Sequence, residues 1–365
     1  MDVMKVKIVT FGCSNNLAES EMMCGLLKKA GHEIVETGED VRIVNVCSVK
    51  GPSLNKGLKE VKSSKVPVVV AGCIPAESVE AIKKVKDDIS LLSTHNFDKI
   101  ADVVDKTSKG LFVDVMEKGK KVKVCLPKIR KNPIVNIVPI SSGCKGECTY
   151  CSVRPIKGKL FSYDEALILE EVKNSVAEGC KEIWLTAQDT GAYGLDIGSS
   201  LPKLLKNILS LDGDFKVRLG MANPNFIFRY LDEMVEILKH PKMFKFLHIP
   251  VQSGSNRILW MMKRPYNCSQ YRKIVAKLKE AHPDITISTD IIVGFPTETD
   301  EEFIESVNMV SETKPDVLNL SKYWPRPGTE AAMLKPIDGD TMKERSAKIK
   351  EAFDEAALEN NKRWL

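Results

Sequence analysis

Residues 136–151 read NIVPISSGCKGECTYC, an apolar strand candidate followed by a glycine-containing loop that carries three cysteines. Cys144, Cys148 and Cys151 have the spacing C-x3-C-x2-C. Three thiolates within eight residues can ligate three corners of a cubane iron–sulfur cluster and leave the fourth iron without a protein ligand. A closed structural zinc site usually needs four ligands, and no nearby Cys or His completes one. The loop therefore predicts a 4Fe–4S cluster.

Downstream of this loop, apolar strand candidates alternate with helical segments. With the strand before the loop, six strands are predicted: Asn136–Ser141, Glu182–Thr186, Lys216–Gly220, Phe244–Ile249, Thr286–Ile292 and Val317–Leu320. Strands that alternate with helices in this way favour a parallel sheet covered by helices. We therefore predict an open, partial (β/α)6 barrel of the TIM type. A polar amphipathic helix is expected after it, over residues 340–365.

The N-terminal region predicts a separate α/β unit. Strand candidates at Lys5–Phe11, Val41–Val46 and Val66–Ala71 are separated by helical patterns, so a small doubly wound parallel sheet is expected. Cys13, Cys47 and Cys73 each end one of these predicted strands. The C-terminal ends of parallel strands share one edge of a sheet, so the three thiols should converge. One such cysteine could be a plain core residue, but three in register predict a second three-thiolate cluster.

These patterns divide the chain into four segments. An N-terminal domain is expected over residues 1–121, a basic linker over 122–135, the barrel over 136–335 and a helical segment over 336–365. Between Lys118 and Lys131 lie seven Lys or Arg residues and no acidic residue. This stretch is either a solvated charged loop or an edge that contacts phosphate groups.

Bulk composition agrees with a cytoplasmic protein that handles an anionic partner. No apolar run approaches the roughly 20 residues that span a membrane, and the N-terminus lacks the layout of a signal peptide. Ten cysteines in a cytosolic chain are more readily explained by metal or cluster ligation than by disulfides. The formal charge of +5 is compatible with nucleic acid without being diagnostic. Cys24, Cys180 and Cys268 are interpreted as structural residues, and Cys125 is left open.

The loop at residues 144–151, with the aromatic Tyr150 before its third cysteine, resembles the signature of the radical S-adenosylmethionine (SAM) superfamily. In TIM-type barrels, reactive groups gather at the C-terminal ends of the strands. SAM would need partners there for its carboxylate, its ribose hydroxyls and its adenine. Together with Tyr150, the candidates at those ends are Gln188, Arg218, Gln252, Ser253, Asp290 and Gly294. For any one of them, a role in the core or in a loop is the alternative.

Over essentially its whole length, the chain resembles the methylthiotransferases, and most closely the archaeal and eukaryotic threonylcarbamoyladenosine tRNA methylthiotransferases (MtaB type). The motifs that carry the resemblance are the three N-terminal cysteines and GCKGECTYCSVR, LTAQDTGAYGLD, RLGMANP, FLHIPVQSGS, MKRPY, TDIIVGFPTET and YWPRPGT. The family usually ends in a small RNA-binding β-barrel, the TRAM domain. This chain ends at Trp364–Leu365, about where that domain would begin, so we expect either that the protein lacks the domain or that the sequence is a truncated form.

The resemblance implies the activity and the partners. One SAM methylates a sulfur at the cluster of the N-terminal cysteines, and a second is cleaved at the cluster of the loop to give a radical. That radical removes hydrogen from C2 of adenosine 37 in the tRNA anticodon loop, and methylthio is transferred there. The implied partners are an electron donor such as ferredoxin or flavodoxin and a sulfur source, and a monomer is expected. Lys128, Arg130, Lys131, Arg154, Lys157 and Arg326 are the candidate tRNA contacts.

Three alternatives remain at this stage. The ribosomal-protein aspartate methylthiotransferases have a motif close to QDTGAYG, and the isopentenyladenosine tRNA branch shares the cysteine pattern. A non-catalytic iron–sulfur carrier is the alternative from a different class, and reductive SAM cleavage would exclude it.

Overall fold

The computed structural model describes residues 2–47 and 51–362, which form two compact units. Unit 1 comprises Met1–Cys144 and Val153–Thr186, and unit 2 comprises Lys145–Ser152 and Ala187–Leu365. The domain boundaries expected near residues 121 and 135 remain predictions, because compactness alone does not define a domain. In the described part of the chain, we find no helix that combines the length and the apolar character needed to cross a membrane.

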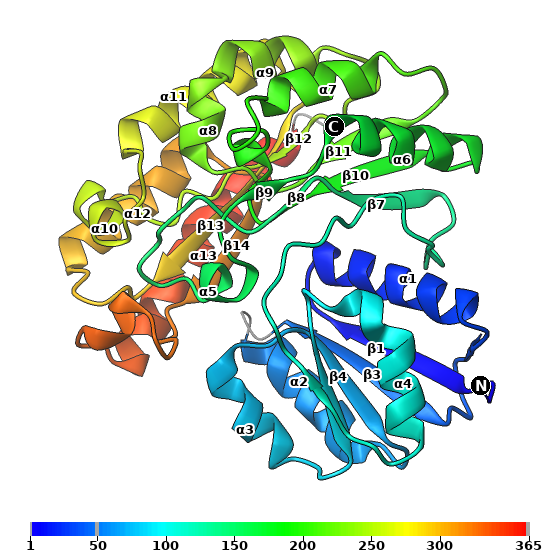
Figure 1. The fold of residues 1–365 in the computed structure, drawn as a ribbon. Helices are drawn as coiled ribbons and strands as arrows, with labels where there is room; N and C mark the ends of the chain where they lie inside the picture. Colours follow the sequence, from blue (N-terminus) through cyan, green and yellow to red (C-terminus); the bar gives the residue numbers. More distant parts are fainter. Residues whose placement is uncertain (1, 48–50, 363–365) are drawn as a thin grey trace. The chain divides into compact units, whose positions relative to one another are not determined.

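Unit 1 contains a six-stranded sheet in the order β2-β1-β3-β4-β5-β6, and every neighbouring pair is parallel (Figure 1). Its strands are β1 (Lys5–Phe11), β2 (Glu33–Ile34), β3 (Val41–Cys47), β4 (Val68–Cys73), β5 (Ile89–Ser93) and β6 (Asp114–Val115). The order 2-1-3-4-5 is that of flavodoxin-like doubly wound sheets, in which ligands bind between the ends of the first and third strands. The predicted doubly wound sheet is confirmed.

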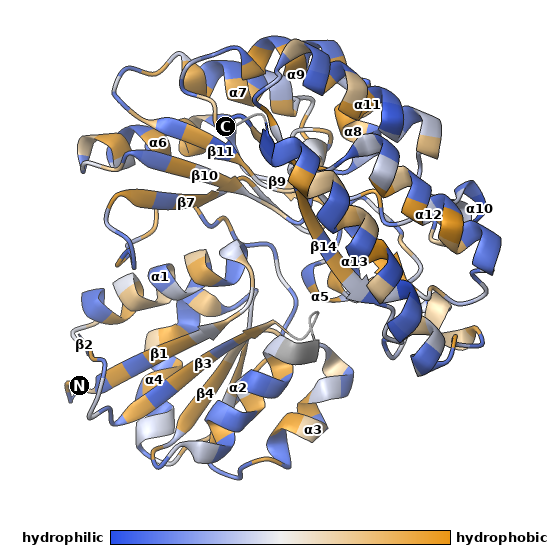
Figure 2. Ribbon diagram, turned by 180° about the vertical axis from the view of Figure 1, so that it is seen from behind, coloured by the Kyte–Doolittle hydropathy of each residue, from blue (hydrophilic) through white to orange (hydrophobic). Residues whose placement is uncertain are grey.

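Helices cover both faces of this sheet, as continuous apolar strands require. The helices are α1 (Ser14–Lys29), α2 (Gly51–Ser63), α3 (Val79–Lys83) and α4 (Ile100–Ser108). Alternate strand residues join different cores: Ile43 packs with residues of α1 and α4, and Val44 with residues of α2 and α3. Figure 2 shows the strands of this sheet as largely apolar with a few hydrophilic residues, and its helices as apolar on one side. β5, α4 and the short β2 and β6 were not predicted.

A second parallel strand pair also belongs to unit 1. β7 (Val135–Pro139) pairs with β10 (Glu182–Thr186) and is joined to it through α6 (Glu165–Ala177), whose first turn is capped by Asp164. Val135 and Ile137 of β7 contribute to the apolar core beneath α1. In the sequence between β7 and α6 lie β8 (Ser141–Ser142), the helix α5 (Val153–Lys157) and β9 (Phe161–Ser162). β8 and β9 form a short antiparallel pair.

Unit 2 continues the alternation of strands and helices. Its strands are β11 (Lys216–Leu219), β12 (Phe246–His248), β13 (Thr286–Val293) and β14 (Val317–Lys322), and the last three form a parallel sheet. Its helices are α7 (Leu201–Leu209), α8 (Pro224–Arg229), α9 (Leu231–Leu238), α10 (Asn256–Met261), α11 (Cys268–Ala281), α12 (Asp300–Thr313) and α13 (Gly339–Asn361). All six strands predicted after residue 135 are therefore present. Tyr230 has a non-helical backbone that separates α8 from α9.

The C-terminal helix α13 is part of the fold of unit 2. Arg345 is buried and its guanidinium binds Glu298 at 2.8 Å and Asp300 at 2.7 Å. Met342 packs against Gly294, where a Cβ atom would lie 2.3 Å from the Met342 side chain. Gly294 also has a φ of +74°, a conformation that favours glycine.

Candidate functional site

Two of the N-terminal cysteines end neighbouring strands in register. Cys47 is the last residue of β3 and pairs directly with Cys73, the last residue of β4. Cys13 lies two residues beyond the end of β1, at the residue that precedes α1. All three therefore follow strands at one edge of the sheet, on either side of the β1/β3 switch point. Cys47 and Cys73 are buried, whereas Cys13 is exposed.

The buried side chain of Asn16 connects these thiols. Its amide nitrogen lies 3.9 Å from the Cys73 sulfur, and its oxygen accepts from the Cys13 backbone N–H at 3.3 Å and lies 3.4 Å from the Cys13 sulfur. Glycine is required beside it, because a Cβ atom at Gly12 would lie 2.4 Å from the Asn16 oxygen. Gly72 is equally constrained, with a φ of +109° and no room for a Cβ atom beside the Val46 carbonyl. At both positions the backbone is packed too closely against its neighbours for a larger residue.

The pair Cys47 and Cys73 favours a thiolate. A side-chain hydrogen bond from Cys47 lowers the pKa of Cys73 to about 6, although burial alone would raise it. The thiolate is the form of cysteine that binds iron. The chemistry of this edge therefore suits an iron–sulfur cluster.

A buried group of charges lies next to the thiols. The Glu19 carboxylate binds the ammonium of Lys123 at 2.6 Å and that of Lys157 at 2.8 Å, and all three side chains are at most 4% exposed. Burial lowers the pKa of Lys123 to about 8. Burial alone would also lower the pKa of Lys157, but the Cys73 thiolate and Glu19 raise it. Two cations facing one carboxylate leave a net positive charge, which favours thiolates and an anionic cluster.

The cysteines of the loop lie in both units and are half-buried. In unit 1, the Cys144 backbone N–H donates to the carbonyl of Gly158 at 3.1 Å. In unit 2, the Cys151 backbone N–H donates to the carbonyl of Cys148 at 3.1 Å, so these two residues form a tight turn. Among residues 2–47 and 51–362, no three Cys, His, Asp or Glu side chains are placed to hold a single metal ion. A cubane cluster has a different requirement, because each thiolate binds a different iron.

Arg264 is a residue at this site that sequence reasoning missed. Its guanidinium donates to the Cys148 sulfur at 2.9 Å and to the Tyr266 hydroxyl at 3.0 Å, and its remaining nitrogen binds the Asn223 amide oxygen. Asn223 is fixed in turn by the buried carboxylate of Asp189, which accepts from its side chain at 2.6 Å. Arg264 belongs to MKRPY, so the motif was visible although its role was not.

Four predicted SAM residues lie along β13 or beside it. Gln252 forms a parallel bridge with β13: its N–H donates to the carbonyl of Asp290 at 2.8 Å, and its carbonyl accepts from Ile292 at 3.0 Å. Ser253 follows Gln252 in the chain, and its hydroxyl lies 3.4 Å from that of Ser306 on α12. The Asp290 carboxylate is 2.7 Å from His248 and accepts from Asn319 at 2.8 Å. Gly294 follows at the end of the same strand.

The other three predicted SAM residues are placed separately in unit 2. Tyr150 packs edge-to-face on Phe295 with ring centres 6.3 Å apart, and the Arg218 guanidinium lies 4.6 Å from the centre of the Phe246 ring. The Gln188 side-chain oxygen is buried, and in the described part of the chain it has no hydrogen-bond partner. A buried unsatisfied acceptor is costly, so a ligand donor would fit there.

The predicted tRNA contacts differ widely in environment. Lys128 is buried, and its ammonium binds the Glu171 carboxylate at 2.6 Å and the Ile137 carbonyl at 3.2 Å, so it is occupied by protein groups. Arg130 pairs with Glu178 at 2.6 Å near the surface. Lys157 is buried against Glu19, as described above. The remaining three are exposed or half-buried: Lys131, Arg154 and Arg326.

The other cysteines have structural environments. Each of the ten cysteines, all within the described residues, is a thiol rather than part of a disulfide. Burial raises the pKa of Cys24 to about 12 and that of Cys268 to about 11. It also raises the pKa of Cys180, whose sulfur contacts the Pro133 carbonyl. These thiols are protonated at neutral pH and are poor metal ligands.

Comparison with known proteins identifies the family. Residues 138–310 match the radical SAM superfamily, and residues 5–93 match a family described as uncharacterized protein family UPF0004. The chain is 39% identical to the probable threonylcarbamoyladenosine tRNA methylthiotransferase of Methanothermobacter thermautotrophicus, over 100% of this chain and 88% of that protein. The chain belongs to the threonylcarbamoyladenosine tRNA methylthiotransferase family.

Other members of this family agree. The chain is 40% identical to the Pyrococcus abyssi protein over 100% of this chain and 87% of that one. It is 40% identical to the Danio rerio enzyme over 96% of this chain, but it spans only 66% of that longer protein. Among solved structures, the radical SAM methyltransferase TsrM of Kitasatospora setae has a TM-score of 0.63 at 13% identity, covering 91% of this chain and 74% of that one. The predicted radical SAM fold class of this methylthiotransferase is therefore confirmed.

Proposed function

We propose that this protein converts N6-threonylcarbamoyladenosine 37 of tRNA to its 2-methylthio derivative. The observation that carries the proposal is the near-40% identity, over essentially the whole chain, to proteins named for that substrate. Both cysteine triplets fit the family, because Cys47 and Cys73 meet in register at the edge where Cys13 also lies, and because Arg264 donates to Cys148. We also propose a cytoplasmic location.

The residues of the chain would hold the cofactors as follows. Cys13, Cys47 and Cys73 would ligate the auxiliary 4Fe–4S cluster, and Cys144, Cys148 and Cys151 the radical SAM cluster. When bound, the two clusters and SAM supply the electron, the radical and the methylthio group of the reaction. Asn16 holds two of the auxiliary thiols in place, and the Glu19 group provides the compensating charge. Gln188, with its unsatisfied oxygen, would accept a hydrogen bond from SAM, and Gln252, Ser253 and Asp290 would line the same mouth.

The partners are proposals of the same kind. The substrate is the tRNA anticodon loop, an external ferredoxin or flavodoxin would supply electrons, and a separate sulfur source would replace the transferred sulfur. The adenine of nucleotide 37 must leave its stack to enter the active site, because its C2 atom is shielded while the base is stacked in the loop. Arg130, Lys131, Arg154 and Arg326 remain proposed contacts to the RNA, and we propose that the protein acts as a monomer.

Mass spectrometry of tRNA nucleosides tests the function directly. We expect the 2-methylthio derivative of threonylcarbamoyladenosine to disappear from cells that lack the gene and to return with the intact gene. Complementation with Cys148→Ala should fail. An unchanged tRNA profile together with loss of methylthio-aspartate from a ribosomal protein would assign the protein to the ribosomal branch instead.

A further inference from the structure

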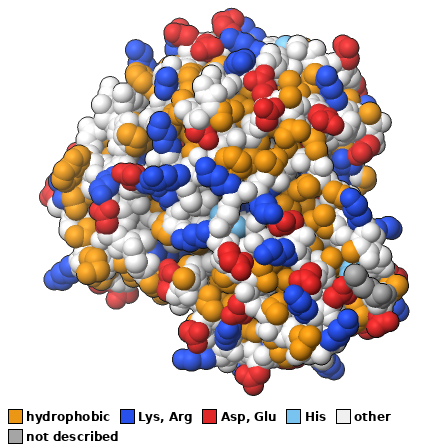
Figure 3. Space-filling model, viewed as in Figure 1, with side chains coloured by type: hydrophobic (Ala, Val, Ile, Leu, Met, Phe, Trp, Pro, Cys, Tyr) orange, Lys and Arg blue, Asp and Glu red, His pale blue; other side chains and the backbone are white. Residues whose placement is uncertain are grey.

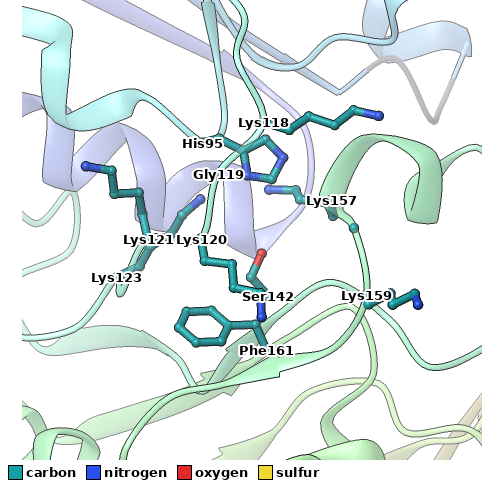
Figure 4. Close-up of a pocket in the computed structure, with 11 residues that line it drawn as sticks. His95, Lys118, Gly119, Lys120, Lys121, Lys123, Ser142, Lys157, Lys159 and Phe161 are labelled. Atoms are coloured by element: carbon teal, nitrogen blue, oxygen red, sulfur yellow. The ribbon is translucent and has the colours of Figure 1, made fainter.

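A cavity in unit 1 is lined by many lysines and by no acidic side chain. Its volume is about 260 Å³, and it lies between the basic segment after β6 and the segment between α5 and β9. Figure 4 shows His95, Lys120, Ser142, Lys157 and Phe161 gathered around one space, with Lys118 and Lys159 extending from its edge. The lysines of the lining are Lys118, Lys120, Lys121, Lys123, Lys157 and Lys159.

Half of these lysines have no carboxylate partner in the described part of the chain. Lys123 and Lys157 share Glu19, and Lys121 pairs with Asp98 at 2.8 Å. The other three, Lys118, Lys120 and Lys159, are exposed. Over most of the face drawn in Figure 3, acidic and basic side chains are mixed. The cavity is therefore a local excess of positive charge.

The aromatic ring of Phe161 holds one of these cations at the cavity. The Lys120 ammonium lies 5.3 Å from the centre of the ring, within the range of a cation–π contact. The ring is itself fixed by edge-to-face packing on the buried Tyr163, with centres 5.7 Å apart. Lys120 is thus directed to the cavity rather than left free in solvent.

The cavity adjoins the auxiliary thiol site. Lys157 lines the cavity, and its ammonium binds Glu19 in the charge group next to Cys73. Lys157 therefore belongs both to the cavity lining and to the charge group beside Cys73. A base that receives sulfur from this site must come close to it, and the phosphates that flank that base come with it.

We propose that the lysine-lined cavity binds a backbone phosphate of the RNA substrate next to the modified nucleotide. This inference rests on the proposed function and adds a place where the substrate is held. Phosphate contacts fix the register of a nucleic acid on a protein, so the cavity would position the base. Each neutralised phosphate also releases counterions, which makes the contact dependent on salt.

The threonylcarbamoyl carboxylate is the competing anion, and the lining disfavours it. Neither anion meets an arginine in this lining, so the number and spread of the lysines decide between them. Lysine ammonium groups act as point charges that suit phosphate oxygens. Three exposed lysines from two segments match a charged backbone that passes the opening better than a single small group.

The test compares two triple variants of the full chain, reconstituted with its clusters. The first is Lys118→Gln, Lys120→Gln and Lys159→Gln. The control carries the same loss of charge at Lys29, Lys62 and Lys65, which are exposed, have no acidic partner among the described residues and lie near the opposite, N-terminal edge of the sheet. Circular dichroism and iron content verify that both are folded. The ligands are anticodon stem-loop RNAs with either threonylcarbamoyladenosine or adenosine at position 37.

We expect the cavity variant to bind both RNAs at least about tenfold more weakly than the control near 0.15 M salt. The slope of log affinity against log salt should become shallower by about 0.7, the contribution of one single-strand phosphate contact. Replacing the phosphates around nucleotide 37 one at a time by uncharged methylphosphonates should weaken binding to wild type at one position. The same replacement should cost the cavity variant little.

Other results would overturn the inference. Equal affinity and equal salt slopes for the two triple variants, with wild type active on RNA, would remove the cavity from RNA binding and leave the proposed function intact. A loss confined to the threonylcarbamoyl RNA would assign the cavity to the side-chain carboxylate instead. If wild type neither binds nor modifies either RNA, the proposed function fails together with the inference.

Discussion

The two cysteine triplets of this protein are assembled in opposite ways. Cys144, Cys148 and Cys151 come from eight consecutive residues, so chain connectivity alone keeps them together. Cys13 and Cys73 are 60 positions apart in the sequence, and only the parallel pairing of β1, β3 and β4 brings their strand ends to one edge. The loop triplet is a local motif, whereas the auxiliary triplet exists only in the folded sheet.

The side chains that surround the two triplets also differ. The auxiliary thiols are served by a buried group, Glu19 with Lys123 and Lys157, whose members also come from distant segments. In the loop triplet, the guanidinium of Arg264 donates directly to the sulfur of Cys148. Changes in the core of unit 1 should therefore impair the auxiliary site, and changes at Arg264 should tune the loop site.

Removing either cysteine triplet should have the largest effect of the changes proposed here, a loss of about half the iron. We expect anaerobically reconstituted protein to hold about eight irons, from two cubane clusters. Replacing Cys13, Cys47 and Cys73 by Ala, or Cys144, Cys148 and Cys151 by Ala, should leave about half, as measured by iron and sulfide analysis. Replacing the protonated thiols Cys24, Cys180 and Cys268 is the matched control and should leave all the iron. Full iron content in the first variant would contradict the auxiliary site.

Glu19→Gln should be the most destabilising single change at the auxiliary site. It leaves two buried ammonium groups without their carboxylate, and breaking a buried ion pair in this way costs about 3–5 kcal/mol. The exposed pair Lys263–Glu330 is the control, and Glu330→Gln should cost less than about 1 kcal/mol. Urea unfolding of the two variants provides the comparison. A Glu19→Gln protein as stable as the control would show that the charge group has no structural role.

Acid should remove part of the stability that the Glu19 carboxylate contributes. Burial alone would raise the pKa of Glu19, but Lys123 and Lys157 lower it well below its ordinary value. A carboxyl with a lowered pKa stabilises the fold above its unfolded pKa of about 4.3 and loses that contribution as the pH falls further. In cluster-free protein, the stability difference between wild type and Glu19→Gln should be constant from pH 7 to about 5 and shrink below it. A stability difference between wild type and Glu19→Gln that grows in acid would contradict a stabilising role for the ionised carboxylate.

Replacing Arg264 should have the smallest of these effects, and the effect should be confined to the loop cluster. Hydrogen bonds to cluster sulfurs help to set the reduction potential, and Arg264→Met removes a charged donor from Cys148. We expect reductive SAM cleavage to slow roughly tenfold, the value of one charge-assisted hydrogen bond. Arg264→Lys should restore part of the rate by keeping the charge. Electron paramagnetic resonance should show a changed loop cluster and an unchanged auxiliary cluster.

Much of the fold could be predicted from the sequence, because it depends on local hydrophobic patterns. All six strands predicted after residue 135 are present, although the short β8 and β9 in the same region were not predicted. β5 (Ile89–Ser93) and α4 (Ile100–Ser108) were missed, since such short segments contain few repeats of a strand or helix period. Cys13 was placed at a strand end and instead precedes α1, where it accepts the first helical hydrogen bond.

The surroundings of the site could not be predicted, because they depend on tertiary contacts. Nothing local distinguishes the buried Lys123 and Lys128 from the exposed Lys118 and Lys120 within the same basic segment. The partners that decide their roles, Glu19 and Glu171, are more than 40 residues away. Spacing revealed the cysteines, whereas only the fold revealed which cations serve the protein and which remain available for an anion.

The most direct test of the central claim, two clusters with separate roles, measures both products in one reaction. Enzyme with Cys13, Cys47 and Cys73 replaced by Ala is incubated with SAM, reductant and threonylcarbamoyl tRNA, beside wild type and Cys148→Ala. Mass spectrometry then quantifies 5′-deoxyadenosine and methylthiolated nucleoside. We predict that the triple variant forms 5′-deoxyadenosine but no methylthiolated nucleoside, and that Cys148→Ala forms neither. Methylthiolated nucleoside from the triple variant would contradict the account.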